Sequence, residues 1–385
     1  MSSISVNTIT DASGGSTTSI NGFTPSVSNM AGRNRIINGD MRVSQRGSVN
    51  VTAGGGTTYT AADRFSEFNY FGSGQINTSI SSEAPTGFSN SLLLSVATAV
   101  PLSGTTGYYA QLGQSIEGSN IASAYDGDVT LSFWVRSSVA GTYSILFTNT
   151  SQLGISSGTR VYVAEYSINS ANTWEKKTIT VSLSTGSSSG TWVSDNTAGF
   201  SVNFNLGAES NRKGNTYLNT WGTYTTAPEF QSASQVQWAS NAGATFYITG
   251  VQLEEGAVAT PFEYRQYGQE LALCQRYYQR FTGNTNVNLN DGALNVMHIW
   301  DSQTAFSGLI LPTVMRSAPT QTYSNASDFQ FFAYSNVKTA SAIGYNGGST
   351  NRVEVTASWS GGLTPGYSGW LRLTQNGWLA YSSEL

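Results

Sequence analysis

Apolar and polar residues alternate in short runs through most of the chain between residues 35 and 263. In one such run, Ile179, Val181 and Leu183 alternate with threonine and serine. A period of two places the apolar side chains on one face of a β-strand, so each run predicts a strand with one buried face. The clearest predicted strands span residues 129–137, 142–149, 160–168, 177–183, 200–206 and 244–253.

Clusters of glycine, serine, asparagine and aspartate separate these runs and are typical of turns. Many short strands with turn-rich connections need a second sheet to cover their apolar faces. We therefore expect residues 35–265 to form a sandwich of two antiparallel sheets, and more specifically a jelly roll.

Residues 266–281 are the one stretch with a helical period. Its apolar stripe consists of Tyr267, Leu271, Cys274 and Tyr278. This spacing predicts one short helix, and the glycine that follows is a residue type that commonly ends helices. We expect residues 266–283 to form a helical connector, with Cys274 as a small core residue.

The two ends of the chain differ from the middle. Residues 284–385 return to alternating runs, which predict a second, smaller β domain. Residues 1–34 hold only scattered apolar side chains and cannot build a core, so we expect an extended arm held by a partner chain, with a flexible arm as the alternative. The predicted fold class is all-β, with an N-terminal extended arm, a central jelly-roll β-sandwich, one short helix and a smaller C-terminal β domain.

Composition narrows the possible partners. Charged residues make up 10% of the chain and the formal net charge is -4, so no basic surface is available for nucleic acid or an anionic membrane. Aromatic residues make up 12%, which argues against disorder. One cysteine excludes an internal disulfide framework. The chain shows neither a signal peptide nor an apolar run of membrane-spanning length, so we expect assembly in a cytoplasm without membrane insertion.

Candidate catalytic groups are few. His298 is the only histidine, and its alternating apolar neighbours indicate a structural or surface position on a strand rather than a general base. The string at 186–190 matches the G-x-S-x-G pattern, but it lies in a Ser/Gly loop with no helix after it, which indicates a chance match. No zinc, phosphate-loop or dinucleotide signature is present, and no cofactor is expected.

Two pairs of carboxylates could carry other chemistry. Glu254 and Glu255 are adjacent, and neighbours on a strand point to opposite faces, so they are poorly placed to share glycan hydrolysis. Asp126 and Asp128 precede a predicted strand and could supply oxygen ligands to Ca²⁺, although a turn is the favoured interpretation. We expect no catalytic residue, no metal site and no enzymatic activity.

The C-terminal domain is dense in rings that could stack on sugars. These rings are Trp300, Tyr334, Tyr345, Trp359, Tyr367, Trp370 and Trp378. Most are expected in the core or between subunits, because a small domain needs its large side chains for burial. The candidates for receptor or glycan contact are Tyr345, Tyr367, Trp359 and Trp370. Of these, Tyr345 and Tyr367 lie in turn-like sequences.

Several blocks together resemble a known family. They are the opening NTITDASGGSTTSINGF, NRIINGDMRVSQRG (34–47), YTAADRF (59–65), FYITGVQLEEGAVATPFEYR (246–265), ELALCQRYYQRF (270–281) and the ending LRLTQNGWLAYSSEL. In this order they are similar to tail-fibre and related virion fibre proteins of bacterial and cyanobacterial viruses. The blocks lie at both ends and in the middle, so the resemblance spans most of the chain.

The resemblance implies a virion component, commonly a homotrimer, with a central part like the jelly roll of carbohydrate-binding modules. Its N-terminal residues 1–34 would attach to other virion proteins, and its distal domains would meet host surface polysaccharide. No catalytic residue is implied. Abundant rings on a low-charge C-terminal domain independently favour an oligomer, since a monomer would expose them.

The predicted function is therefore a trimeric tail fibre or spike that attaches to host glycans. A capsid decoration protein, such as a head fibre or cement protein, is the first alternative. A glycan-degrading tailspike and a free bacterial carbohydrate-binding module are the others, and the arm and the missing signal do not suit the last.

Overall fold

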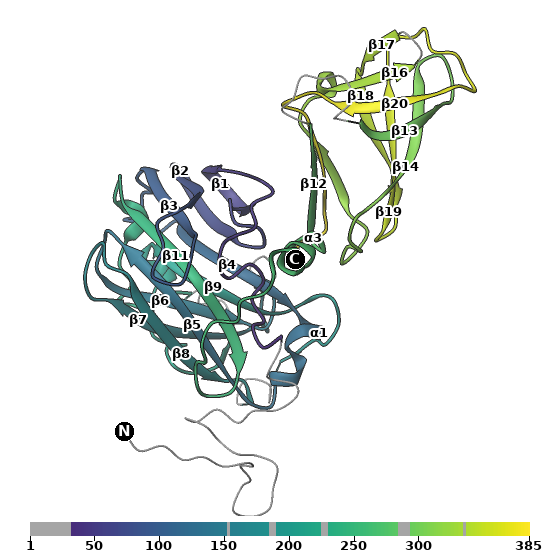
Figure 1. Cartoon of the computed structure of the whole chain (residues 1–385). Helices are drawn as coiled ribbons and strands as arrows, with labels where there is room; N and C mark the ends of the chain where they lie inside the picture. The colour runs from purple at the N-terminus through teal and green to yellow at the C-terminus, as the bar shows by residue number, and fades with distance from the viewer. Residues whose placement is uncertain (1–31, 152–154, 185–189, 225–229, 284–292, 334–335) are drawn as a thin grey trace, which may run out of the picture. The chain divides into compact units, whose positions relative to one another are not determined.

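The computed structural model describes residues 32–151, 155–184, 190–224, 230–283, 293–333 and 336–385 (Figure 1). The chain divides into two compact units, one of Met1–Gln266 with Leu385 and one of Tyr267–Glu384. Both consist mainly of antiparallel strands, so the predicted all-β class is confirmed. Residues 1–31 of the predicted arm, most of the 186–190 string and Tyr334 lie outside the described residues.

The first unit is a β-sandwich (Figure 1). Its strands are β1 (Val49–Tyr59), β2 (Ser66–Ser81), β3 (Ser91–Thr98), β4 (Tyr109–Glu117), β5 (Asp128–Ser137), β6 (Gly141–Thr148), β7 (Arg160–Ile168), β8 (Glu175–Ser182), β9 (Ala198–Ala208), β10 (Gly222–Thr223) and β11 (Thr245–Glu255). The six clearest sequence predictions correspond to β5, β6, β7, β8, β9 and β11, and they are confirmed to within two residues at most ends. Helical elements are short, namely α1 (Gly118–Ile121) and the 3-10 turns η1 (Ala122–Ala124), η3 (Ser210–Arg212) and η4 (Trp238–Ser240).

Strand β2 joins the two layers of the sandwich. The hydrogen-bonded order is β10-β7-β6-β9-β4-β2-β3-β11-β5-β8, and β1 pairs with β2. Residues 66–70 of β2 pair with β4, whereas residues 75–81 pair with β3. The first part of β2 therefore belongs to the layer that contains β4, and its second part belongs to the layer that contains β3.

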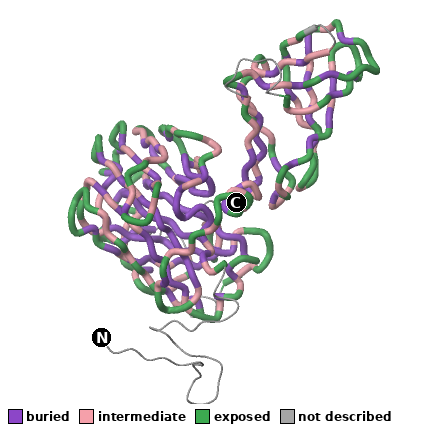
Figure 2. The backbone as a smooth tube through the Cα atoms, viewed as in Figure 1, coloured by how far each residue is buried: buried purple, intermediate pink, exposed green. Residues whose placement is uncertain are grey.

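Aromatic rings from the two layers meet inside the sandwich. Phe133 of β5 packs edge-on against Tyr166 of β7 and Phe204 of β9, with ring centroids 5.1 and 5.0 Å apart. All three side chains are buried. Figure 2 shows the same concentration of buried residues along the strands of this unit. The alternation in the sequence thus reflects one face of each layer turned toward a shared core.

The second unit holds two further sheets. Its elements are α3 (Tyr267–Gln275), β12 (Tyr278–Thr282), β13 (Ala293–Ile299), β14 (Thr304–Ile310), β15 (Thr320–Tyr323), η5 (Ala326–Asp328), β16 (Phe329–Ala333), β17 (Asn336–Thr339), β18 (Ala342–Gly348), β19 (Arg352–Ser358), β20 (Ser368–Leu373) and β21 (Trp378–Ser382). Three strands pair in the order β12-β21-β15, and seven pair in the order β17-β16-β20-β13-β14-β19-β18. Buried side chains such as Phe331, Leu371 and Met297 form its core.

The helix predicted over 266–281 is shorter than the pattern indicates. Helix α3 ends at Gln275, and Tyr278 begins β12, where it pairs with Ser382 of β21. Backbone pairing with β21 satisfies the polar groups of residues 278–282 and overrides the helical spacing of the side chains. Cys274 is buried in α3, as predicted. No helix among the described residues has the length and apolar character needed to cross a membrane.

Candidate functional site

The four predicted sugar-contact residues occupy different environments. Trp370 is 58% exposed and Tyr367 is 47% exposed, so both can reach a partner. Trp359 is only 3% exposed and packs against Phe331, with ring centroids 4.9 Å apart. The prediction that Trp359 contacts a glycan is therefore wrong, because its ring belongs to the core of the second unit.

Tyr345 also turns toward the interior. It lies within β18 rather than in a turn, and its hydroxyl donates a hydrogen bond to Pro319 O at 2.8 Å. Its ring lies 6.3 Å from that of the buried Tyr381. Burial raises the pKa of the Tyr345 hydroxyl above its usual value. These contacts make Tyr345 a packing residue and leave Trp370 and Tyr367 as the accessible pair.

Trp370 belongs to a line of apolar side chains across four strands of the seven-stranded sheet. Val337 pairs with Phe332, Phe332 pairs with Trp370, and Trp370 pairs with Val296. Residues directly opposite one another share a face of the sheet, and the neighbours of Trp370 along β20 are buried on the other face. We call Val337, Phe332, Trp370 and Val296 the apolar row. All but Phe332 are exposed, and Phe332 is half-buried beneath the Arg372 guanidinium, 3.5 Å from its ring centroid.

A second line on the same face is more polar. His298 pairs with Ser368 on one side and with Phe306 on the other, and its Nδ1 lies 3.1 Å from the Ser368 Oγ. Trp300 directly follows β13 and is 71% exposed, and its ring lies 5.9 Å from that of Phe306, the residue that pairs with His298. Hydrogen-bonding groups therefore lie between two exposed tryptophans on one surface, which we call the outer face.

The spacing of the two tryptophans suits an extended ligand. Trp370 lies opposite Val296, and Trp300 is four residues beyond Val296 along the chain. At ~3.3 Å per residue this separates the two rings by roughly 13 Å along the strand direction. A short oligosaccharide can span such a distance and stack on both rings.

The two exposed tryptophans could have been identified from the sequence, because every second residue of a strand points to the same face of the sheet. Trp370 alternates with Leu371 and Leu373, so it falls on the face opposite to the apolar one. Trp359 has the same parity as Val355 and Ala357, which are buried. Trp300 directly follows the last residue of β13 and is two residues from His298, so the same rule predicts that it lies on the side of His298. The sequence prediction weighed turn-like surroundings instead of parity and therefore missed Trp300.

Polar side chains on the β4-β9-β6 layer of the sandwich are covered by another segment of the chain. Asn205 and Ser144 alternate with core residues, but both are fully buried. Asn205 Nδ2 donates to Phe230 O at 3.0 Å, and Ser144 N donates to the Gln235 side chain at 2.7 Å. The segment around residues 230–235 thus covers this layer and occupies its polar groups.

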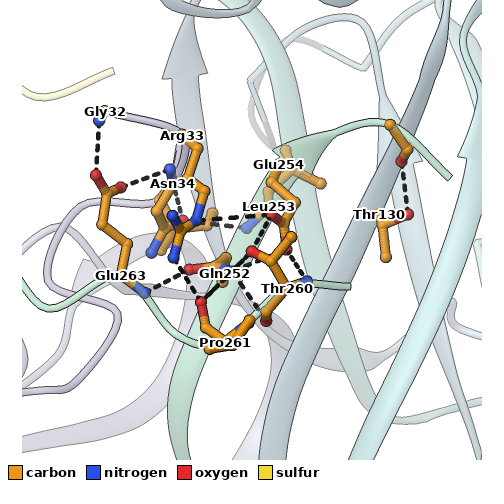
Figure 3. Close-up of polar contacts among 12 residues, drawn as sticks. Gly32, Arg33, Asn34, Thr130, Gln252, Leu253, Glu254, Thr260, Pro261 and Glu263 are labelled. Carbon is orange, nitrogen blue, oxygen red and sulfur yellow. Dashed lines mark hydrogen bonds and ion pairs between the residues drawn. The ribbon is translucent and has the colours of Figure 1, made fainter. Parts of the chain in front are cut away.

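The adjacent acids Glu254 and Glu255 have separate structural partners. Glu254 is buried and accepts hydrogen bonds from Thr260 N, from Thr260 Oγ1 and from Gln252 Nε2, at 2.9, 2.5 and 2.8 Å (Figure 3). Glu255 pairs with Arg35 at 2.5 Å and with Ser123. Neither carboxylate faces the other across a shared space, as expected from their adjacent positions on a strand.

A third carboxylate fixes the first described residues to the sandwich. Glu263 accepts hydrogen bonds from Gly32 N at 2.6 Å and from Asn34 N at 2.8 Å (Figure 3). The Asn34 side chain in turn accepts from Ile36 N and from Leu253 N. Residues 32–34 were predicted to be part of the arm, and this boundary is wrong because their polar groups are built into the β11 edge.

Asp126 and His298 are the remaining predicted groups. Asp126 lies in a turn before β5, as favoured from the sequence. Among the residues that the structure describes, no group of three or more His, Cys, Asp or Glu side chains could hold a metal ion. His298 is exposed on β13, and no hydrogen bond or ion pair joins its ring to a carboxylate within the described ranges.

Comparison with known proteins gives weak structural similarities. No protein-family model and no curated protein matches the sequence. A putative sugar binding protein from Bacteroides thetaiotaomicron is 15% identical, with 58% of this chain and 100% of that chain covered and a TM-score of 0.34. The enzymatically active domain of tailspike protein 4 from bacteriophage CBA120 is 15% identical, with 57% and 21% covered and a TM-score of 0.29.

A family 11 carbohydrate-binding module from a Clostridium thermocellum cellulase is 18% identical, with 54% of this chain and 99% of that chain covered and a TM-score of 0.28. The chain thus resembles a sugar-binding protein, a tailspike domain and a carbohydrate-binding module, and all three TM-scores are below 0.5.

Proposed function

We propose that this chain is a non-enzymatic structural protein of a virus particle, a trimeric tail fibre or spike whose C-terminal unit binds glycans on the host surface. The observation that carries the glycan-binding part is the outer face, where Trp370 and Trp300 are exposed on either side of His298 and Ser368. The virion and trimer parts are supported by the sequence resemblance and by the low charge of the chain.

The outer face matches the chemistry of a sugar. The apolar C–H face of a pyranose packs against an indole ring, and its hydroxyls need neutral donors and acceptors nearby. Trp370 and Trp300 provide the rings, while Ser368 and His298 provide hydrogen-bonding groups between them. Contiguous exposed apolar surface, unlike a single exposed ring, often marks an interaction site, and the apolar row forms such a surface beside Trp370. The outer face is therefore the proposed receptor-facing surface.

A second candidate, a glycan-modifying hydrolase, is favoured by one observation, the 3.1 Å contact between Ser368 Oγ and His298 Nδ1. A serine nucleophile also needs a group that orients the histidine and a site that shields the oxyanion from water. Both side chains are exposed, and in the described chain no carboxylate contacts the ring. This arrangement favours sugar binding over catalysis.

The binding part is tested on an array of bacterial capsular and lipopolysaccharide glycans. The wild-type chain should bind a subset of them, and Trp370→Ala should bind the same glycans more weakly. Ile310→Ala is the matched control, because Ile310 is an exposed aliphatic residue on the same face. If Trp370→Ala and Ile310→Ala lose the same amount of glycan binding, the ligand binds through general apolar contact, which would contradict stacking of a sugar on the Trp370 ring.

The virion part is tested on particles. Antibody against the chain should label the virus at a fibre or spike, and sedimentation of the purified chain should give a trimer. Labelling over the whole capsid would support the decoration alternative. A monomer that is absent from particles would contradict both virion readings.

A further inference from the structure

We propose that Arg372 is a specificity-determining residue of the outer face and that its guanidinium binds an acidic group of a saccharide stacked on Trp370. This inference rests on the proposed function and names the class of glycan, one that carries negative charge. It concerns the same surface as the two tryptophans, because Arg372 itself lies on that surface.

The strand pairing places Arg372 on the outer face. Ser368, Trp370 and Arg372 alternate along β20 with buried residues, and every second residue of a strand points to the same side. On β16, Gln330 pairs with Arg372. The next outward residue of β16 is Phe332, which pairs with Trp370. Arg372 therefore shares a surface with Trp370 and with the apolar row.

The guanidinium of Arg372 is fixed close to the Trp370 ring. Its Nε and Nη2 donate to Gln330 Oε1 at 3.2 and 2.7 Å, and its Cζ lies 3.5 Å from the centroid of the Phe332 ring. Arg372 is two residues from Trp370, or roughly 7 Å along the strand, and Phe332 lies on the adjacent strand about 4.8 Å away. A sugar that stacks on Trp370 thus has the guanidinium within reach of its substituents.

The contacts that fix the guanidinium leave its charge in place. Neither an amide oxygen nor a phenyl ring carries a net charge, so Gln330 and Phe332 orient Arg372 without cancelling its positive charge. A planar guanidinium matches the geometry of a carboxylate or phosphate and can donate to both of its oxygens. An oriented guanidinium beside a stacking ring therefore favours a sugar with an acidic group over a neutral one.

The strands around Trp370 contain basic residues and no acidic ones. Across the described strands β17, β16, β20, β13 and β14, the charged residues are Lys338 and Arg372. Lys338 alternates with the exposed Val337 and points to the other face. The sheet's first acidic residue beyond these strands is Glu354 of β19. An anion near Trp370 therefore meets a positive charge on the outer face.

The two ends of the outer face differ in charge. Trp300 lies past the Ser368 end of β20, whereas Arg372 follows Trp370 at the other end. Asp301 directly follows Trp300, and its carboxylate accepts two backbone hydrogen bonds. A carboxylate repels an anion, so the Trp300 end disfavours an acidic group. The acidic group is therefore expected on the sugar that stacks on Trp370.

The experiment titrates the full chain with an oligosaccharide that contains glucuronic acid and with the same oligosaccharide after its carboxyl groups are reduced to alcohols. The wild-type chain should bind the acidic form at least about tenfold more tightly. Arg372→Gln should lower this ratio to less than about twofold and leave the affinity for the reduced form unchanged. Arg372→Lys should keep part of the ratio, because it retains the charge and loses the planar pair of donors.

Arg352→Gln is the matched control. Arg352 is exposed and pairs with Ile310, so the substitution removes the same charge from the same face. It lies on β19, three strands from β20 in the order of the sheet. The preference for the acidic form should persist in this variant. An equal loss of preference in Arg352→Gln and Arg372→Gln would show that only the overall charge matters and would overturn the assignment to Arg372.

A role of Arg372 in packing alone would give a different result. Arg372→Gln would then weaken the binding of both forms by the same factor, which would overturn the inference. The wild-type ratio tests the inference without any variant, and equal affinity for both forms, with weaker binding by Trp370→Ala, would overturn this inference and leave the proposed function standing.

Two further outcomes concern the acidic group itself. A sulfated oligosaccharide that binds in an Arg372-dependent way, while the glucuronate form does not bind, would identify sulfate as the acidic group and support the inference. Binding to none of the saccharides here or on the array would reject the proposed function as well.

Discussion

Trp370 lies directly opposite Val296 on the outer face of the seven-stranded sheet, and about half of each side chain is exposed. Their sequence neighbours Leu371 and Met297 point to the other face and fill the core. The second unit therefore has a complete core without Trp370. Its ring is available for contact with another molecule, and the stability of the fold does not depend on it.

Substitution of Trp370 and of Trp359 should have opposite consequences. Trp370→Ala should weaken glycan binding by about 1–2 kcal/mol, roughly five- to thirtyfold, because it removes one stacking ring. It should change the free energy of unfolding by less than about 0.5 kcal/mol, since the residue is exposed. Trp359→Ala should instead destabilise the second unit by about 3–5 kcal/mol, because its ring is buried. Titration and thermal unfolding of both variants distinguish the two roles, and a folding defect in Trp370→Ala would contradict this assignment.

Glu67 should make the stability of the sandwich depend on pH. Burial raises the pKa of its carboxyl from 4.5 to about 8, and a hydrogen bond from Asn69 opposes the shift only partly. The folded protein thus keeps a proton that the unfolded chain releases above pH 4.5. The protonated Glu67 therefore contributes fully to the stability of the folded state below pH 4.5. As the pH rises toward 8, the free energy of unfolding should fall by up to about 5 kcal/mol.

The comparison of Glu67→Gln with the wild-type chain tests this dependence by urea unfolding at pH 5, 7 and 9. The variant should lack the decline in stability, because an amide carries no titrating proton. Glu83→Gln is the control, since Glu83 is largely exposed in its ion pair with Arg136. A decline of the same size in Glu67→Gln would show that another group titrates.

The structure also predicts that residues 32–34 stabilise the sandwich. A chain that lacks residues 1–34 should be less stable than one that lacks residues 1–31. The longer deletion removes the Asn34 oxygen that accepts hydrogen bonds from Ile36 N and Leu253 N at 3.0 and 3.1 Å. Asn34→Ala alone should cost about 1–3 kcal/mol, because it leaves buried backbone donors without partners.

Asn211→Ala provides a comparison for Asn34→Ala. Asn211 is exposed and donates one side-chain hydrogen bond, to Thr105 O. Its loss should change the free energy of unfolding by less than about 0.5 kcal/mol. If both truncations and both point variants unfold at the same urea concentration, residues 32–34 do not contribute to the sandwich.

The sequence predicts those parts of the fold that depend on local alternation. In β5 and β9 every second residue is apolar, and Phe133 and Phe204 meet in the core as a result. The apolar row could not be predicted in this way. Its members come from β17, β16, β20 and β13, which are adjacent only because of the strand order of the sheet.

The wrong length of the predicted helix and the wrong boundary of the predicted arm have a similar physical origin. The helical spacing of residues 266–281 gave no sign that Tyr278 pairs with Ser382, more than a hundred residues away in the chain. Likewise, the polar residues at 32–34 looked unable to form a core, and their role depends on Glu263 at the far end of the sandwich sequence. The structure of both segments depends on partners that are distant in the sequence, and a local pattern of residues gives no information about such partners.

The central claim, that the exposed tryptophans of the outer face bind an intact glycan, is tested most directly with a Trp300→Ala/Trp370→Ala double variant. Its affinity for a polysaccharide that the wild-type chain binds is measured by titration calorimetry, and the same samples are assayed for new reducing ends. The account predicts that the wild-type chain binds, that the double variant loses binding while unfolding at the same temperature, and that no new reducing ends form. Unchanged affinity in the double variant, or cleavage of the polysaccharide by the wild-type chain, would contradict it.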